Sequence, residues 1–483
     1  MHALNNMDFI IRKGEMHSLI GENGCGKSTM IKIISGFYDF DDGELFFNGK
    51  KYGKVTPIEA MREGVQVIYQ DFSLFPNLTV AENIMMSKFI ESNGKTMNWK
   101  ETFRLAENQI RQLNVELDPH KLVSDINIAQ KQIVAICRAL TLNAKLIIMD
   151  EPTSALTHKE IDALYKIVAD LMSKGISVVF VSHKLDEVET ISNRVTVMRN
   201  GSNVFEGLTK DLTKEKMTYY MTGREIRQES YAAEIEGTAS VLEVKNFSNY
   251  RDFNDINFSL YPKEVLGITG LMGSGRSEIA EALFGLIPYT GDVFIREKKT
   301  VIKNVSTAIK NGIAYVPEDR CTEGLHMERS IGENAIVCVL DQILDRTRLV
   351  DNKKKNQKMV EILSGLTIAG MEYNKEVRLL SGGNQQKVLL VKWLGTKPDI
   401  LILNCPTVGV DVGSKSDIHN IIRNIAKEGI AVIVISDDIP EIMQVCNRVL
   451  IVKNGRITHQ MDTKDTGIDE VEAMLIEDES NVS

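Results

Sequence analysis

The stretch that decides the fold is Gly21-Glu-Asn-Gly-Cys-Gly-Lys27-Ser28, which lies between the strand-like residues 18–20 and the helix-like residues 29–34. Glycine-rich loops in this setting are typical of phosphate binding, because backbone N–H groups converge on phosphate oxygens at a helix N-terminus. Lys27 would neutralise the outer phosphates, and the Ser28 hydroxyl would bind Mg²⁺. The expected nucleotide-binding residues are Gly21, Glu22, Asn23, Gly24, Cys25, Gly26, Lys27, Ser28 and Thr29.

The chain repeats this pattern with changes. Residues 270–277 read Gly-Leu-Met-Gly-Ser-Gly-Arg-Ser, so Arg276 stands where the first loop has Lys27. Residues 127, 150, 151, 157 and 183 have partners 254 positions later, and these pairs read Asn/Ser, Asp/Asn, Glu/Cys, Thr/Asp and His/Asp. An internal repeat of this length predicts two similar domains. The second loop adds Gly270, Gly273, Gly275, Arg276 and Ser277 to the expected nucleotide-binding residues.

Short apolar runs at 146–149, 178–181, 401–403 and 432–435 are expected to form strands. Continuous apolar runs of this length suit parallel strands that are buried on both faces. Helical stretches separate them, so each half is predicted to be an α/β domain with a mainly parallel sheet.

Composition and charge narrow the class of protein. The chain has 483 residues, 43% of them hydrophobic, which is ample material for two cores. The net charge of −9 argues against nucleic acid as the main partner. No apolar run approaches the roughly 20 residues that cross a bilayer, and the N-terminus lacks a signal-peptide pattern. The six cysteines show no paired spacing, which favours reduced thiols.

Two carboxylates follow one of the expected strands. Asp150 and Glu151 end the run Leu146-Ile-Ile-Met and precede Pro152. This position is the carboxyl edge of the sheet, where α/β proteins bind ligands. Asp150 could hold Mg²⁺ through water, and Glu151 could orient and deprotonate a water aimed at the γ-phosphate. A helix cap would explain Asp150 alone but not the pair.

Two further polar residues end strands beside the same edge. His183 follows residues 178–181, and its imidazole suits a sensor of the γ-phosphate better than a structural role. Gln70 follows Val67-Ile-Tyr, and its amide could contact Mg²⁺ or water, although a polar surface residue is the alternative. The expected catalytic residues are therefore Glu151, His183 and Gln70, and the expected metal ligands are Ser28, Gln70 and Asp150.

One more motif identifies a family. Leu380-Ser381-Gly382-Gly383-Asn384-Gln385 precedes an apolar helix and resembles the signature of ATP-binding cassette (ABC) proteins. The segments 316–320 and 406–413 resemble the second half of the duplicated ATPases of bacterial sugar importers of the ribose, galactose and xylose class. The resemblance implies two tandem P-loop NTPase domains at 1–225 and 241–483, each with a helical subdomain, joined by a linker at 226–240.

In that family, two ATPase domains meet head to tail, and each nucleotide lies between the phosphate loop of one domain and the signature of the other. The resemblance therefore implies a first site, built on the phosphate loop of the first half, in which every position carries the residue type that ATP hydrolysis needs. Its second-half members would be Ser381, Gly382, Gly383, Gln385 and Asp411.

The second site collects every substitution. Asn404 lacks the carboxylate that would hold the metal's water, and Cys405 replaces the base. Losing general-base catalysis costs about 10²–10⁴ in rate. Asp437 would add negative charge beside a γ-phosphate, and the signature counterpart at 126–130 reads Ile-Asn-Ile-Ala-Gln. This site is expected to bind ATP as a clamp without turnover.

The start of the repeat differs between the halves. Residues 241–250, with the alternating Leu242, Val244 and Phe247, are expected to form an edge strand that the first half lacks. Either the true start lies upstream of Met1 or the first domain lacks that strand. ABC domains stack an aromatic side chain on adenine, and in the second half Tyr250 or Phe253 could serve.

The resemblance implies the ATPase subunit of a sugar importer, with ATP and Mg²⁺ as cofactors. Its partners would be two transmembrane permease subunits and, through them, a solute-binding protein, at the cytoplasmic face of the membrane and without nucleic acid. A soluble tandem ABC protein that acts on ribosomes or DNA is one rival interpretation. A non-catalytic remnant is another, because the first strand is missing.

Overall fold

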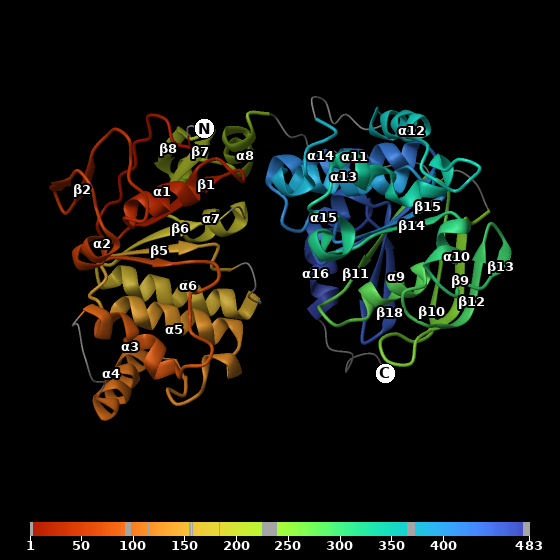
Figure 1. The fold of residues 1–483 in the computed structure, drawn as a ribbon. Helices are drawn as coiled ribbons and strands as arrows, with labels where there is room; N and C mark the ends of the chain where they lie inside the picture. Colours follow the sequence, from red (N-terminus) through yellow and green to blue (C-terminus); the bar gives the residue numbers. More distant parts are fainter. Residues whose placement is uncertain are drawn as a thin grey trace, which may run out of the picture. The chain divides into compact units, whose positions relative to one another are not determined.

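The computed structural model describes residues 3–91, 98–113, 115–153, 156, 158–182, 184–224, 239–364 and 372–476. The chain divides into two compact units, Met1–Ile226 (unit 1) and Arg227–Ser483 (unit 2), and each is described by itself (Figure 1). Thr157, His183 and almost all of the expected linker lie outside the described residues.

A six-stranded sheet forms the centre of unit 1, in the order β4-β5-β6-β1-β7-β8. Neighbouring strands run parallel except β7 and β8, which pair antiparallel. The expected strands at 146–149 and 178–181 are confirmed as β5 and β6. The bounds are β1 (Met16–Gly21), β4 (Val65–Ile68), β5 (Leu146–Asp150), β6 (Ser177–Val181), β7 (Arg194–Arg199) and β8 (Ser202–Leu208).

Helices cover both faces of this sheet. In Figure 1, α1 and α2 lie on one side of it and α5 and α6 on the other. Successive β5 residues serve the two faces, since Ile147 and Met149 belong to one apolar cluster and Ile148 to the other. The bounds are α1 (Lys27–Ile34), α2 (Pro57–Glu63), α5 (Ile128–Leu140), α6 (His158–Ser173), α7 (Leu185–Ile191) and α8 (Lys214–Thr222).

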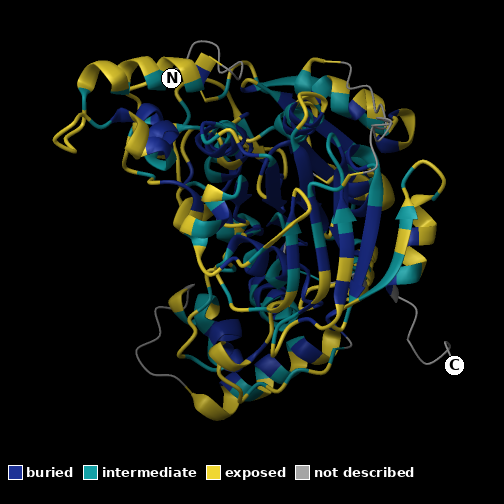
Figure 2. Cartoon of the chain, turned by 90° about the vertical axis from the view of Figure 1, so that its right-hand side faces the viewer, coloured by how far each residue is buried: buried dark blue, intermediate teal, exposed yellow. Residues whose placement is uncertain are grey.

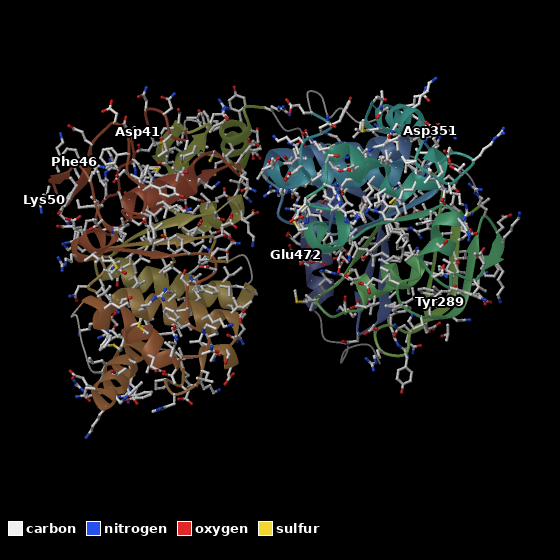
Figure 3. The ribbon with its side chains drawn as sticks, viewed as in Figure 1. Asp41, Phe46, Lys50, Tyr289, Asp351 and Glu472 are labelled. Atoms are coloured by element: carbon white, nitrogen blue, oxygen red, sulfur yellow. The ribbon has the colours of Figure 1, made fainter. Side chains whose placement is uncertain are left out.

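Two smaller parts complete unit 1. The helices α3 (Val80–Glu91) and α4 (Trp99–Gln112) pack on α5 and form a helical subdomain. The strands β2 (Leu45–Phe47) and β3 (Lys50–Tyr52) form a hairpin, on which Figure 3 labels Phe46 and Lys50. In the described ranges of unit 1, no strand pairs with this hairpin, and residues 3–15 form none.

Unit 2 repeats the central sheet strand for strand, in the order β14-β15-β16-β11-β17-β18, with only β17 and β18 antiparallel. The expected strands at 401–403 and 432–435 are confirmed as β15 and β16. The strands β11, β15 and β16 are buried along their whole length, and Figure 2 draws the buried residues in dark blue. The bounds are β11 (Val265–Thr269), β14 (Ile313–Val316), β15 (Ile400–Asn404), β16 (Ala431–Ile435), β17 (Arg448–Lys453) and β18 (Arg456–Asp462).

The helices of unit 2 include a helical subdomain in which α11 and α12 pack with α13. No helix in the ranges described for either unit combines the length and apolar character needed to cross a membrane. The bounds are α9 (Arg276–Phe284), α10 (Val305–Lys310), α11 (Ile331–Ile336), α12 (Asn352–Ser364), α13 (Gly382–Leu394), α14 (Val412–Lys427), α15 (Ile439–Val445) and α16 (Ile468–Ile476).

A four-stranded antiparallel sheet distinguishes unit 2, in the order β10-β9-β12-β13, where unit 1 has only the β2-β3 hairpin among its described residues. The bounds are β9 (Leu242–Ser248), β10 (Ile256–Leu260), β12 (Thr290–Ile295) and β13 (Lys298–Thr300). The expected strand at 241–250 exists, but the prediction that it lies at a sheet edge is wrong. The strand β9 pairs with β10 on one side and with β12 on the other, so Leu242, Val244 and Phe247 are all buried.

Candidate functional site

The first phosphate loop leaves the central strand β1 and closes around its own lysine. The Lys27 ammonium donates to the carbonyls of Gly21 at 2.7 Å and Glu22 at 2.9 Å, and the side chain is buried. Gly26 has a φ of 109°, and a Cβ there would lie 2.7 Å from the Ala3 carbonyl oxygen. The loop therefore requires glycine at this position, and its backbone is shaped to receive an anion at the start of α1.

Cys25 serves this loop as a small buried side chain. Its Sγ lies 3.9 Å from Lys27 Nζ, and burial raises the pKa of the thiol. A Cβ on Gly21 would meet the same sulfur at 2.6 Å, so the thiol fills the turn. The tip residues Asn23 and Gly24 and the hydroxyl-bearing Ser28 are exposed.

The two carboxylates lie at the carboxyl end of β5. Burial first, and then the charge of Glu151, raise the pKa of Asp150 above its ordinary value, whereas Lys27 and Lys32 lower it. Glu151 has a left-handed backbone with φ 47°, and its N–H donates to the Val181 carbonyl at 2.9 Å. Asp150 therefore lies in the electrostatic field of the loop lysine, as a site for a metal–phosphate group requires.

Magnesium fits this set only together with phosphate. Among the described residues, no group of three or more His, Cys, Asp or Glu side chains could hold a metal ion. The oxygens of Ser28, Gln70 and Asp150 are of the type that Mg²⁺ prefers, and Mg²⁺ is commonly held by one or two protein oxygens and substrate phosphates.

Gln70 is exposed just beyond β4, at the start of a loop that hydrogen bonds hold in place. Arg138 on α5 donates to the carbonyls of Phe72 at 2.9 Å and Ser73 at 2.8 Å. Both of these residues have positive φ values, 58° and 45°. The Asn83 side chain also accepts from the Phe75 N–H at 2.8 Å.

The second loop has the same shape but a different cation. Arg276 donates to the Gly270 carbonyl, and its Nη2 lies 3.7 Å from Asp437 Oδ1. Gly273 and Gly275 have φ values of 78° and 94°, as the turn requires. The loop cation of unit 2 thus forms an ion pair with Asp437, the residue that aligns with His183.

The metal position of unit 2 is neutral. Ser277 Oγ donates to Asn404 Oδ1 at 3.4 Å, and Asn404 Nδ2 donates to the Tyr315 hydroxyl at 3.3 Å. Burial raises the pKa of the Cys405 thiol to about 12, and the charge of Glu318 adds to this effect. Cys405 therefore carries its proton at neutral pH and cannot act as a base.

The signature turn of unit 2 depends on its glycines. Ser381 caps α13 by accepting from the Asn384 N–H at 3.4 Å. A Cβ on Gly382 would lie 2.8 Å from the Gly409 carbonyl oxygen, and one on Gly383 would collide with Ser414. In unit 1 the same turn reads Asn127-Ile128-Ala129, and the Asn127 side chain accepts from the Gln130 N–H at 2.8 Å.

Gln385 and Asp411 support this turn from within unit 2. The Gln385 amide donates to the carbonyls of Val377 at 3.3 Å and Leu380 at 3.2 Å, and its side chain is buried. Asp411 caps α14 by accepting from the Ser414 N–H at 2.8 Å. Sequence reasoning grouped both with the nucleotide-binding residues, and the structure places them beneath and beside the signature glycines.

Sequence reasoning missed a buried carboxylate in each unit. Glu187 accepts from Thr153 Oγ1 at 2.6 Å and Ser182 Oγ at 3.0 Å. Glu441 accepts from Thr407 Oγ1 at 2.7 Å and Ser436 Oγ at 2.7 Å. These bonds tie the segment after each Asp-Glu or Asn-Cys pair to the segment after the next strand. The signal in the sequence was a Glu at equivalent positions of both halves, 254 residues apart.

Arg320 was also missed as a link within unit 2. It donates to the carbonyls of Val408 at 2.6 Å and Gly409 at 3.2 Å, and to Gln385 Oε1 at 3.2 Å. It therefore joins the segment after Glu318 to the signature helix and to the segment before Asp411.

The two candidates for adenine stacking have different environments. Phe253 is buried and stacks on Phe247, with ring centroids 5.1 Å apart. Tyr250 is fully exposed, so only its ring is accessible to a ligand.

The fold and the loops define a P-loop ATPase core that is built twice. The model of the ABC transporter family matches residues 4–154 and 253–408, which include both phosphate loops and both strand-end pairs. The chain belongs to the ABC transporter family.

Curated relatives match almost the whole chain. The Ribose import ATP-binding protein RbsA of Geobacillus kaustophilus is 38% identical over 97% of this chain and 94% of its own length. The relative of the same name from Bacillus subtilis is 36% identical over 96% and 94%. A Putative ribose/galactose/methyl galactoside import ATP-binding protein of Hahella chejuensis is 38% identical over 95% and 90%.

Solved structures match the tandem fold as well. A model of ribosome-bound archaeal Pelota and ABCE1 has a TM-score of 0.61 at 20% identity, over 96% of this chain and 78% of the other. A complex of archaeal ribosomal stalk protein aP1 and ribosome recycling factor aABCE1 has a TM-score of 0.58 at 21% identity, over 98% and 90%. At these identities the likeness concerns the fold alone.

Proposed function

We propose that this chain is the ATP-hydrolysing subunit of an importer for a sugar or sugar-like solute. The observation that carries the proposal is identity of 36–38% to sugar-import ATP-binding proteins over 95–97% of the chain. Residues 1–225 and 241–483 are the two ATPase domains, with 226–240 as the linker. The partners are two permease subunits and, through them, a solute-binding protein, at the cytoplasmic face of the membrane.

Hydrolysis takes place at site one, where the loop of unit 1 holds ATP. Lys27 neutralises the outer phosphates, and its bonds to Gly21 and Glu22 hold the ammonium inside the loop beforehand. Glu151 accepts the proton of the water that attacks the γ-phosphate. Ser28, Gln70 and Asp150 would hold Mg²⁺, which would supply charge stabilisation when bound. His183 senses the γ-phosphate.

The signature of unit 2 completes site one. Ser381, Gly382 and Gly383 present a helix N-terminus with no side chain over its glycines, which suits a γ-phosphate. Asp411 lies at the start of the next helix and joins the same site. ATP binding closes the two units on each other, and hydrolysis reopens them.

Site two binds nucleotide without turnover. Arg276 still offers a cation, but Asn404 and the protonated Cys405 leave no carboxylate at the end of β15. Its signature carries Ile128 and Ala129 where site one has glycines. This site acts as a clamp.

Motion passes to the permeases through the segments that follow Gln70 and Glu318. The anchors of these segments support the proposal. Arg138 fixes the first segment to α5, and its counterpart Lys392 on α13 donates to the Gly324 carbonyl at 2.7 Å. A displacement of the segment after Gln70 or of the segment after Glu318 would therefore move a helix of the helical subdomain.

The rival function is a soluble tandem ABC protein that acts on ribosomes. Co-purification distinguishes the import function from the ribosomal function. The chain is expressed with the membrane-protein genes that neighbour its own, and a tag on the chain is used to recover complexes from detergent-solubilised membranes. The import function predicts recovery with permease subunits, and solute-stimulated ATP hydrolysis by the complex. Recovery with ribosomes in place of permeases would refute the import function, and a complex without hydrolysis would favour a non-catalytic remnant.

A further inference from the structure

The cation of the second phosphate loop is paired within its own unit. Arg276 Nη2 lies 3.7 Å from Asp437 Oδ1, while Nη1 donates to the Gly270 carbonyl. The guanidinium side chain is 9% exposed and the Asp437 side chain is 62% exposed. A carboxylate therefore covers the solvent side of the one cation that the loop offers.

Strand order brings Asp437 to this position. The strand β16 lies between β15 and β11, and Ile435 pairs with Ile268 just before the loop begins. Asp437 follows β16 by two residues, and Arg276 is the first residue of α9. In phosphate loops this cationic position faces the β- and γ-phosphates, so Asp437 occupies the side from which the outermost phosphate would approach.

The equivalent residue of unit 1 is His183. A histidine ring can donate a hydrogen bond and carries no negative charge in either protonation state. The exchange for aspartate therefore turns a group that attracts the terminal phosphate into one that repels it. Two carboxylates that would compete for Arg276 are absent at the end of β15, because Asn404 and Cys405 stand there.

The rest of the second loop remains suited to phosphate. Gly273 has a φ of 78° and open space where a Cβ would be. Ser274 is 7% exposed, and its hydroxyl has no hydrogen-bond partner among the described residues. The loop runs into the N-terminus of α9, a helix of nine residues. An ideal Cβ on Gly270 would collide with Ser274 Oγ, so this hydroxyl fills the turn as the Cys25 thiol does in unit 1. The loop cation, backbone donors and a positive helix end together favour a short phosphate chain.

We propose that the second loop is a nucleoside diphosphate site, from which Asp437 excludes the third phosphate. The inference rests on the proposed function, since it assumes that residues 270–277 bind nucleotide. Arg276 and the loop backbone hold the two inner phosphates. Repulsion between Asp437 and a third phosphate lowers the affinity for the triphosphate by about tenfold, or about 1.4 kcal/mol.

This preference changes the role of the clamp. A site that holds diphosphate stays occupied whether or not ATP is present at the other loop. Unit 2 would then contribute a constant nucleotide, and only the loop of unit 1 would respond to the change from ATP to ADP. The importer would take one nucleotide per cycle rather than two.

The test is a competition experiment on the full chain. Lys27→Ala weakens the first loop, and fluorescent mant-ADP reports binding. The Arg276→Ala substitution is then added to the Lys27→Ala variant. The part of the mant-ADP fluorescence that this second substitution removes reports binding at the second loop. ADP and the non-hydrolysable triphosphate AMP-PNP are then compared as competitors, with Asp437→Asn as the variant. Asp341→Asn is the matched control, because it removes an exposed carboxylate elsewhere in unit 2.

ADP is expected to compete at about tenfold lower concentration than AMP-PNP at the second loop. Asp437→Asn should bring the two within about threefold by tightening AMP-PNP, and Asp341→Asn should change nothing. Equal competition, or a ratio that Asp437→Asn leaves unchanged, would overturn the inference. A signal insensitive to Arg276→Ala would overturn both the inference and the clamp role, whereas the import function is decided separately by co-purification.

Discussion

Glu151 and Cys405 share one unusual backbone geometry at equivalent strand ends. Each has a φ of 47°, and their N–H groups donate to the carbonyls of Val181 at 2.9 Å and Ile435 at 2.8 Å. Left-handed backbone is costly for residues with a side chain and persists where the surroundings enforce it. Unit 2 has therefore kept the backbone shape of the strand end that carries Glu151 in unit 1, while a protonated thiol stands in place of the carboxylate.

The ionised carboxylate of Asp150 should lower the free energy of unfolding of unit 1. Burial and Glu151 raise its pKa, so the penalty is present in full above the folded-state pKa and vanishes below the ordinary value of 3.8. Asp150→Asn should raise the melting temperature of the nucleotide-free protein by about 2 °C at pH 7. Calorimetry should show this gain shrinking as the pH falls to 4. The matched control is Asp162→Asn, an exposed change on α6, and a gain that ignores pH would contradict the explanation.

Arg138 should act as a positioning residue for the loop after Gln70. Arg138→Ala frees the carbonyls of Phe72 and Ser73, so motion at the phosphate site is transmitted less well. Solute uptake by reconstituted vesicles should fall about fivefold more than ATP hydrolysis does. Arg104→Ala removes an exposed arginine from α4 and serves as the control. Equal losses of uptake and hydrolysis would mean that Arg138 supports the fold and not the coupling.

The signature glycine Gly383 should matter far more than its counterpart in unit 1. A Cβ at Gly383 collides with Ser414, so Gly383→Ala displaces the signature turn, which we propose completes site one. Hydrolysis should fall by about tenfold or more. Ala129→Gly changes the equivalent position of unit 1. It should change the rate of hydrolysis less than about twofold, because we propose that this turn belongs to site two, which does not hydrolyse ATP. A larger effect from Ala129→Gly would reverse the assignment of the two sites.

The sequence was sufficient for inner strands of the central sheets and for the phosphate loops, but not for the antiparallel pairs β7-β8 and β17-β18. The runs that became β5, β6, β15 and β16 are short and continuously apolar, which suits parallel strands buried on both faces. The loops carry their chemistry in eight consecutive residues each. Local sequence therefore determines these parts almost alone.

Contacts between distant residues could not be predicted in the same way. The edge prediction for β9 failed because its second neighbour, β12, lies some 45 residues later and has no sequence mark of pairing. Glu187 and Glu441 were overlooked because one hydroxyl partner of each, Thr153 or Thr407, comes from a different strand end. Tyr250 and Phe253 were equivalent in sequence, and only packing on Phe247 separates them.

The central claim is that hydrolysis belongs to the loop of unit 1 alone. It is tested most directly by steady-state ATP hydrolysis and ATP binding in the complex with its membrane partners. Glu151→Gln should keep ATP binding and lower hydrolysis by about 10² or more. Cys405→Gln and the size-matched Cys405→Ser should stay within about twofold of the parent protein, because a protonated thiol contributes no base. A greater loss from either Cys405 variant than from Glu151→Gln would contradict the claim.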